Sequence, residues 1–339
     1  YSPWAFPTSP MSRQLFEYHP VLAYRFIPGL KARVPHESGG YLVQANETGF
    51  RSNHTFAKTR TAGKRRALIF GDSFTAGDGV SNHKRYTDVL EARVPGLEVY
   101  NFGLSGTGTD QQYLAWREFA RDIEHDVLVI SVLVENIRRV AARYRRYVDD
   151  SGREVVYAKP YYTLDQGELV LHHSPPPREP IPEDKLPPEE RENVDRGGRF
   201  ALLRQVVNTL GVKDVVQKIT RYQPVPEYDS PDQPMWLVMR AIIARWVREH
   251  DAQSPVILMP LPLYQHVEGA SDPDNYQARF RELTRELGVT LHDPLPDLLR
   301  YSPDERRRFR FEKDVHPTPE GHTALAESLR ATVERVLGA

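Results

Sequence analysis

The stretch Ala67-Leu-Ile-Phe-Gly71-Asp72-Ser73-Phe74-Thr-Ala-Gly77-Asp-Gly79-Val80 decides the fold of this chain. Its first four residues form an apolar run as long as a buried strand, and the run leads directly into Gly-Asp-Ser and a glycine-spaced segment. A serine at the carboxyl end of such a strand lies where open α/β sheets bind their ligands. Its N–H can also point at developing negative charge. A plain turn is the competing interpretation, because Gly, Asp and Ser are common turn residues.

Strands and helices alternate outward from this stretch. The 127–134 run is apolar except for Ser131, as expected in the middle of a covered parallel sheet. Thr318 and Pro319 suit the N-cap and first position of a final helix. The alternation predicts right-handed crossovers and a doubly wound parallel α/β sheet. The expected strands are 67–70, 97–102, 127–134, 255–259 and 289–292, and the expected helices are 85–93, 111–123, 236–250, 276–287 and 318–337.

Two regions fall outside this alternation. Residues 1–60 are rich in proline and aromatic residues, and we expect an arm with short strands that packs on the core. Residues 146–235 contain polar turns and a proline-rich run, which should be extended and polyproline-like, followed by helices at 200–210 and 212–222. We interpret 146–235 as an insertion that covers or borders the site; a surface excursion without a role is the alternative. The sheet domain is then made of 61–145 and 236–339.

Composition excludes several classes of protein. The 339 residues carry 45 basic and 46 acidic side chains, and this balance argues against a nucleic-acid partner. There is no cysteine, so a thiol nucleophile, a disulfide and a thiolate metal site are all excluded. No run approaches the 18 apolar residues of a membrane span. The chain starts at Tyr1 rather than Met, and we expect a native start, with a signal or an anchor, to precede it.

A serine becomes a nucleophile when a base and an orienting acid stand beside it. Of the 12 histidines, His316 is the best placed, because it follows Asp314 by two residues and precedes the final helix. Asp314 could hold the imidazole in the right tautomer while Nε2 faces Ser73. A histidine before a helix is more often a capping or surface residue, and that alternative stays open.

An acyl transfer also needs donors for the oxyanion, each worth roughly 3–4 kcal/mol of barrier. Gly103, Gly106 and Gly108 lie in the loop after the second strand, and Asn136 follows the third. A flexible glycine turn and a helix-capping Asn are the alternatives for each feature alone. Ser73, the glycine loop and Asn136 all fall at the carboxyl ends of successive strands, a coincidence that those alternatives do not predict.

These residues resemble the SGNH subgroup of the GDSL esterases and lipases. Block one is matched by Gly71-Asp-Ser-Phe74, with Phe in place of the usual Leu, and block two by Asn101-Phe-Gly-Leu-Ser-Gly106. Block three, normally Gly-x-Asn-Asp, reads Val134-Glu-Asn-Ile137 and keeps only the Asn. Block five, usually Asp-x-x-His, here has Lys313 three residues before His316 and the acid at Asp314. The shorter spacing is similar to that of SGNH-like proteins that act on bacterial polysaccharide acetyl groups.

The resemblance covers about 65–145 and 235–339. It implies a flavodoxin-like fold with Ser73 as nucleophile, His316 as base and Asp314 as its orienting acid. It further implies an oxyanion hole made by the N–H groups of Ser73 and Gly106 and the amide of Asn136. It also suggests an exported bacterial protein.

Other residues suggest substrate contacts or can be set aside. A basic cluster follows Asn136, and such a run is usually a solvated helix face, although Arg138 or Arg139 could point toward an anionic substrate; Asp72 and Tyr264 are further candidates for substrate contact. His172-His173 lacks the spacing of a metal site, so we expect no metal or other cofactor. No dinucleotide fingerprint or phosphate loop is present. The basic cluster consists of Arg138, Arg139, Arg143, Arg145 and Arg146.

We therefore expect a serine esterase that forms an acyl-enzyme on Ser73 and removes a short, acetyl-like acyl group from a carbohydrate or another polar metabolite. An apolar tunnel for a long chain would leave a stripe that the sequence lacks. Two alternatives remain. The same residues could serve an O-acyltransferase in which a sugar or metabolite hydroxyl replaces water. A non-catalytic glycan-binding module could also have kept the fold.

Overall fold

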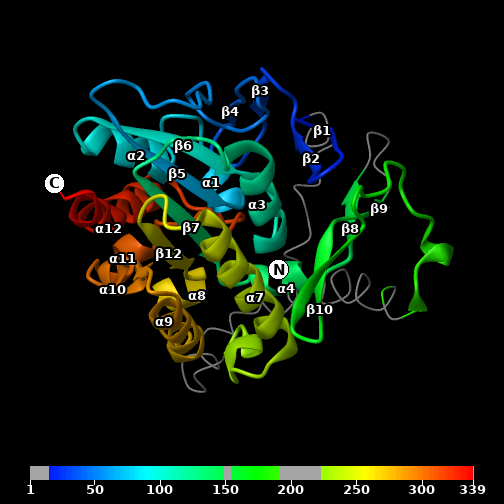
Figure 1. The fold of residues 1–339 in the computed structure, drawn as a ribbon. Helices are drawn as coiled ribbons and strands as arrows, with labels where there is room; N and C mark the ends of the chain where they lie inside the picture. The colour runs from blue at the N-terminus through cyan, green and yellow to red at the C-terminus, as the bar shows by residue number, and fades with distance from the viewer. Residues whose placement is uncertain (1–14, 149–153, 189, 191–222, 339) are drawn as a thin grey trace.

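A computed structural model describes residues 15–148, 154–188, 190 and 223–338 of the chain (Figure 1). Its centre is a five-stranded, all-parallel sheet in the order β13-β12-β7-β5-β6, which is the order 2-1-3-4-5 of flavodoxin-like folds when the strands are numbered along the chain. The strands are β5 (Arg65–Gly71), β6 (Leu97–Gly103), β7 (Val127–Leu133), β12 (Val256–Leu261) and β13 (Thr290–Leu291). The predicted doubly wound α/β sheet is confirmed.

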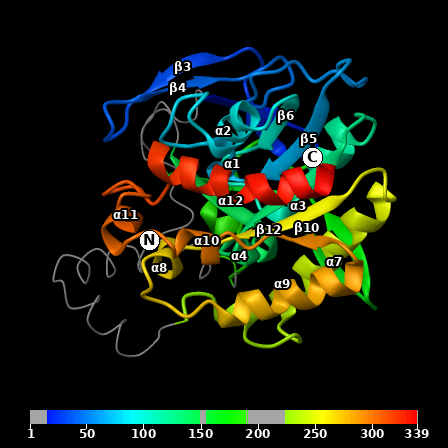
Figure 2. The same ribbon diagram turned by 90° about the vertical axis from the view of Figure 1, so that its left-hand side faces the viewer.

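Helices cover both faces of the sheet, as right-handed crossovers require. α2 and α12 pack together on one face, where α12 crosses in front of the strands in Figure 2. α3, α7 and α9 lie on the other face. These helices are α2 (Tyr86–Arg93), α3 (Thr109–Ala115), α7 (Pro234–His250), α9 (Asp274–Leu287) and α12 (Pro319–Leu337). The shorter helices are α1 (Ser73–Ala76), α4 (Asn136–Ala141), α8 (Tyr264–Val267), α10 (Leu295–Leu298) and α11 (Pro303–Arg307).

The core lies between these layers. Every residue of β7 is buried, and the apolar run of β5 is fully enclosed. Phe70 stacks on Phe102 of the neighbouring strand, with 4.6 Å between ring centroids, while Trp246 of α7 meets Phe70 edge-on. The sheet is therefore a rigid support for the residues that follow its strands. The expected helix 111–123 is instead α3 followed by a π-helical turn at Trp116–Ala120.

Two hairpins precede the sheet, β1–β2 (Phe16–His19, Ala23–Phe26) and β3–β4 (Lys31–Val34, Tyr41–Gln44). Arg51 holds the second hairpin against the loop after α1. Its fully buried guanidinium donates to the carbonyls of Gly77 (2.7 Å) and Val80 (2.8 Å) and to the Asn82 side chain. Asn82 in turn donates to the carbonyl of Gln44 (2.9 Å). The arm is thus anchored beside the stretch that opens the fold.

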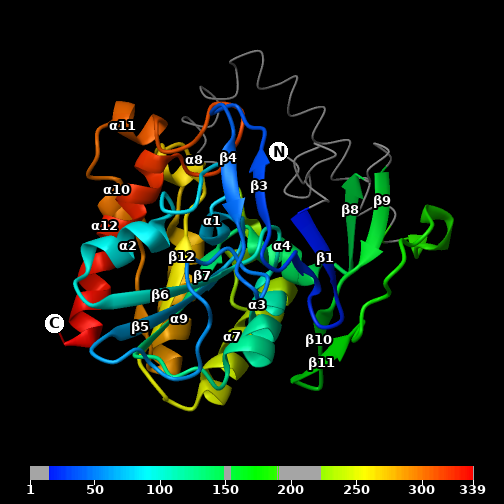
Figure 3. The same cartoon turned by 90° about the horizontal axis from the view of Figure 1, so that it is seen from above.

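Two further hairpins lie where the sequence suggested only turns. They are β8–β9 (Tyr144–Val148, Glu154–Ala158) and β10–β11 (Tyr161–Asp165, Glu168–His172), and Figure 3 shows β8 and β9 beside β1. Tyr24 of β2 contacts Arg145 of β8 through its hydroxyl (3.2 Å). The proline-rich run that follows is irregular, with a 3-10 turn at Glu183–Lys185. A second 3-10 turn lies at Pro226–Tyr228, after the segment 200–222 in which the sequence predicts two helices. Those helices fall outside the described residues, and the four-part division of the chain stays a prediction.

Candidate active site

Ser73 lies on a tight turn between β5 and α1. It is the first residue of α1, and the Asp72 side chain caps this helix by accepting from the N–H of Phe74 (3.1 Å). Two glycines allow the turn to sit directly over the strand ends. A Cβ on Gly71 would lie 2.0 Å from Thr75 Oγ1, and one on Gly103 would lie 2.2 Å from the backbone nitrogen of Ala76. Gly71 of the Gly-Asp-Ser sequence is therefore a steric requirement of the turn, and Ser73 supplies its hydroxyl.

A chain of hydrogen bonds joins Ser73 to the loop before α12. Ser73 Oγ lies 2.9 Å from His316 Nε2, and His316 Nδ1 lies 2.6 Å from Asp314 Oδ1. An ionised carboxylate only accepts, so Nδ1 carries the imidazole proton and Nε2 is free to accept the serine proton. Thr318 caps α12 as expected, accepting from Gly321 N–H, and Pro319 is the first helical residue. Ser73 and His316 are 243 positions apart in the chain but meet in the fold. With Asp314 behind the imidazole, the three residues have the arrangement of a nucleophile, a base and an orienting acid.

The electrostatics of the site favour this protonation pattern. Burial would raise the pKa of Asp314, but the hydrogen bonds and charge of His316 hold it well below its usual range. Burial would lower the pKa of His316, but its hydrogen bond to Asp314 and the nearby carboxylates of Asp314, Asp78 and Asp72 raise it above the ordinary value. Asp78, which accepts from the Ser105 hydroxyl (2.7 Å), has its own pKa raised by burial.

Asn136 is the first residue of α4, directly beyond the carboxyl end of β7. The residue is fully buried, and neither atom of its side-chain amide has a hydrogen-bond partner among the described residues. A buried polar group without a partner costs stability, so such a group in a folded protein needs an explanation. A substrate oxygen at the same sheet edge as Ser73 would supply the missing acceptor.

Gly106 lies in the loop after β6 with a φ of +76°, a region that favours glycine. Its carbonyl accepts from the guanidinium of Arg145, which is buried. The N–H of Ser73, at the start of α1, has no intrahelical acceptor. The three predicted oxyanion donors thus follow β5, β6 and β7, which are neighbours in the sheet.

Arg139 of α4 ties these three segments together. Its Nη1 donates to Asp72 Oδ2 (2.8 Å) in the serine turn and to the carbonyl of Thr107 (3.2 Å) in the glycine loop. Asp72 is fully buried and the Arg139 side chain is 7% exposed, so the pair lies inside the protein. The interpretation of the basic cluster as a solvated helix face is therefore wrong for Arg139 and Arg145, because both guanidinium groups bond to internal acceptors. Sequence reasoning named Asp72 and Arg139 but missed that they pair with each other.

The other two candidates for substrate contact lie apart from this pair. Arg138 makes two bonds to Glu227 (2.6 and 3.2 Å) and one to the carbonyl of Pro224 (2.7 Å), which fastens α4 to the segment before α7. Tyr264 begins α8 and carries the guanidinium of Arg310 over its ring at 4.6 Å. A substrate role for these side chains stays a prediction.

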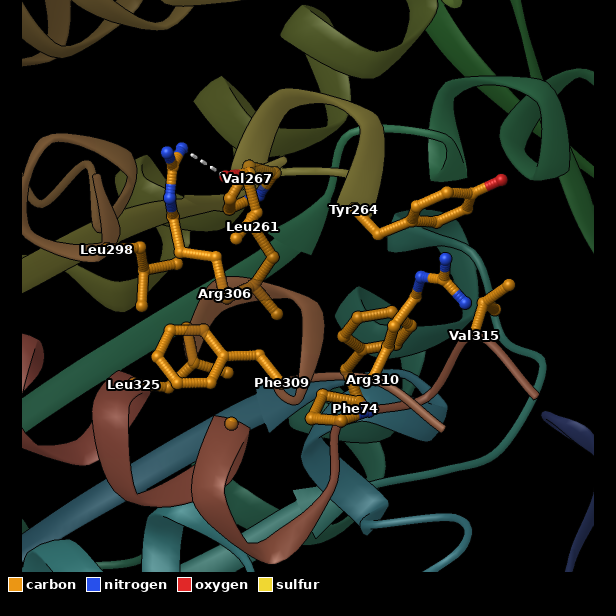
Figure 4. A pocket seen from close by; sticks show the side chains of 13 residues that line it. Phe74, Leu261, Tyr264, Val267, Leu298, Arg306, Phe309, Arg310, Val315 and Leu325 are labelled. Carbon is orange, nitrogen blue, oxygen red and sulfur yellow. Dashed lines mark hydrogen bonds between the residues drawn. The ribbon is translucent and has the colours of Figure 1, made fainter. Parts of the chain in front are cut away.

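Tyr264 and Arg310 also line an apolar pocket of about 50 Å³ (Figure 4). Phe74 follows Ser73 in the chain and its ring lies 5.4 Å from that of His316, between centroids, so the pocket lies close to these two residues. Val315, which precedes His316, lines it as well. No sequence pattern predicts this pocket, because its walls come from five separate segments. The remaining lining residues are Leu261, Pro262, Val267, Leu298, Arg306, Phe309, Pro317, Gly321 and Leu325.

The sequence profile of the GDSL-like Lipase/Acylhydrolase family matches residues 69–324. The chain belongs to this family. The match spans Ser73, Gly106, Asn136, Asp314 and His316, and it identifies the protein as a serine ester hydrolase of the SGNH type. No curated protein matches the chain at a significant level.

Several solved structures are similar to this GDSL-like chain. A member of the lipolytic G-D-S-L family from Veillonella parvula is 11% identical with a TM-score of 0.42, over 80% of this chain and 99% of that one. The lipase/acylhydrolase from Enterococcus faecalis is 12% identical with a TM-score of 0.42, over 80% and 96%. Axe2, an acetylxylan esterase from Geobacillus stearothermophilus, is 15% identical with a TM-score of 0.42, over 83% and 97%.

The described part of the chain has neither a ready-made metal site nor a helix that could span a membrane. No group of three or more His, Asp or Glu side chains is arranged there to hold a metal ion. No helix in that part is both long enough and apolar enough to cross a membrane.

Proposed function

We propose that this protein removes a short acyl group from an ester of a carbohydrate or another polar metabolite, through an acyl-enzyme on Ser73. The observation that carries the proposal is the bonded series Ser73–His316–Asp314, together with a buried Asn136 amide that has no partner among the described residues and follows the strand next to that of Ser73. A serine with a purely structural role needs neither a base 2.9 Å from its hydroxyl nor a hydrogen-bond donor that lacks an acceptor at the same sheet edge.

Ser73 Oγ attacks the ester carbonyl while His316 Nε2 takes its proton. Asp314 keeps the imidazole in the productive tautomer and stabilises the imidazolium. The negative charge on the carbonyl oxygen is met by the N–H groups of Ser73 and Gly106 and by the Asn136 amide. His316 then gives its proton to the leaving alkoxide, which departs as an alcohol. A water attacks the acyl-enzyme by the same steps, releases the acid and restores Ser73.

The size of the apolar pocket supports a short acyl group. One water molecule needs about 10–15 Å³ of such space, so 50 Å³ holds roughly three to five atoms of that size. An acetyl to butyryl chain fits this volume. The alcohol side of the ester would face away from the pocket, toward solvent.

Labelling with a fluorophosphonate tests the proposal, with intact-mass detection. We expect one adduct on the wild-type protein and none on Ser73→Ala or His316→Ala. Hydrolysis of p-nitrophenyl esters should then be fastest for acetyl to butyryl chains. An unlabelled wild-type protein of native fold would refute the serine mechanism. Labelling without ester hydrolysis, but with acyl transfer to an added sugar, would assign the chain to the O-acyltransferases instead.

A further inference from the structure

The N-terminal arm reaches the candidate active site through the turn between β3 and β4. His36 Nε2 lies 3.2 Å from Asp314 Oδ2, the carboxylate oxygen that His316 does not use. The carboxylate of Glu37 accepts from the backbone N–H of Asp314 (2.8 Å) and of Lys313 (3.0 Å). Two adjacent residues of the arm therefore hold the side chain and the backbone of the orienting acid.

The direction of the His36 hydrogen bond follows from its other ring nitrogen. Nδ1 accepts from the backbone N–H of Ser38 (3.2 Å), so Nε2 carries the proton and donates to Asp314. The ring orientation is fixed by aromatic neighbours. Phe311 contacts it edge-on at 4.5 Å between centroids, and Tyr41 does so at 5.7 Å. The His36 side chain is 11% exposed and that of Asp314 is 30% exposed, so the bond is partly shielded from water.

Asp314 needs such support, because it lies in a loop without regular structure between α11 and α12. Its Oδ1 binds both the ring and the backbone N–H of His316, two residues on. A carboxylate bound through one oxygen alone can rotate about its last torsion, and that rotation would loosen the bond to His316. A second donor on Oδ2 prevents the rotation.

We propose that His36 is a positioning residue for the acid of the catalytic triad, and that the arm thereby completes the active site. The series runs His36–Asp314–His316–Ser73, so the site draws on the arm and both halves of the sheet domain. This inference rests on the proposed function, since positioning matters only if His316 acts as a base.

The test compares three variants. His36→Leu removes the hydrogen bond and keeps an apolar side chain against Phe311. His36→Gln restores an N–H donor at about the same distance from the backbone. His54→Leu is the matched control. His54 lies on the same arm, and its Nε2 is 2.7 Å from the carboxylate of Glu91, which is not part of the triad.

With p-nitrophenyl acetate, we expect His36→Leu to lower kcat about tenfold at an unchanged KM, His36→Gln to recover most of it, and His54→Leu to leave it unchanged. The acid limb of the pH profile should move to lower pH in His36→Leu, since a loosened Asp314 no longer holds up the pKa of His316. A limb that does not move, or an equal loss in the control, would overturn the proposal. The titratable groups facing His316 are Asp314, Asp78 and Asp72, with His36 and His322 around them.

Two further measurements separate this inference from the proposed function. In an Asp314→Asn background, His36→Leu should have no additional effect, whereas additive losses would contradict the positioning role. If the wild-type protein proves inactive, NMR titration of the His316 imidazole in wild type and His36→Leu still decides. A lower pKa in the variant supports the inference, and an unchanged one overturns it.

Discussion

The Asn136 amide gives the sharpest prediction about the site. Its two polar atoms are buried without partners among the described residues, so Asn136→Ala breaks no hydrogen bond seen there. The free energy of unfolding should therefore change by no more than about 1 kcal/mol. In the proposed reaction the same substitution removes one of three oxyanion donors. Loss of one such donor costs roughly 2.7–4 kcal/mol, so kcat should fall about 100- to 1,000-fold.

Asn101 provides the matched control, because it is equally buried but fully bonded. Its amide donates to the carbonyl of Thr75 and to the hydroxyl of Thr87 (both 2.8 Å) and accepts from Gly103 N–H (2.7 Å). At about 0.5–1.5 kcal/mol for each of these three bonds, Asn101→Ala should lower the free energy of unfolding by roughly 1.5–4.5 kcal/mol.

The assay pairs urea unfolding with kcat and KM for p-nitrophenyl acetate in both variants. We expect Asn101→Ala to lose stability and Asn136→Ala to lose kcat at nearly constant KM. The oxyanion assignment would be refuted if Asn136→Ala kept more than about a tenth of the wild-type kcat. It would also be refuted if the loss of kcat were matched by a loss of stability like that of Asn101→Ala.

Three other predictions follow from the site. Only the neutral imidazole accepts a proton, and the pKa of His316 is raised, so kcat/KM should rise with pH through a midpoint above about 6.5. Asp314→Asn should lower that midpoint in the pH–rate profile. A midpoint that does not move would contradict the pairing of Asp314 with His316. Asp72→Asn leaves the buried Arg139 without its charged partner and should lower the free energy of unfolding in urea by about 3–5 kcal/mol. The double variant Asp72→Asn/Arg139→Leu should recover part of that loss. Equal losses in the single and double variants would argue against the ion pair. Phe309→Ala enlarges the apolar pocket and should shift the preference toward longer p-nitrophenyl esters. At about 0.8 kcal/mol for each buried methylene, kcat/KM should gain about fourfold per added methylene. An unchanged chain-length profile would place the acyl group outside this pocket.

The sequence by itself determined the sheet and the residues that follow its strands. Buried parallel strands are continuous apolar runs, so β5, β7 and β12 could be located to within a few residues. β6 carries Glu98 and Asn101 and was located by its place in the strand–helix alternation. The turn after β5 has a local steric cause in Gly71, and Thr318-Pro319 marks the start of α12 by local capping. Such signals are read from neighbours along the chain and need no knowledge of the fold.

Only the tertiary structure decided which polar groups meet. His36 and Asp314 are 278 positions apart, and Asp72 and Arg139 are 67 apart, so no local pattern links either pair. The basic cluster after Asn136 looked like a solvated face, because a sequence shows charge but not the internal acceptors that a guanidinium reaches. The hairpin β10–β11 is local instead, because Gln166 and Gly167 at positive φ close it in a two-residue turn whose signal lies in the sequence. The apolar pocket and the internal acceptors of the guanidinium groups were missed because they are not local. Each depends on segments brought together by the packing of the whole chain, and burial is a property of that packing rather than of any one segment.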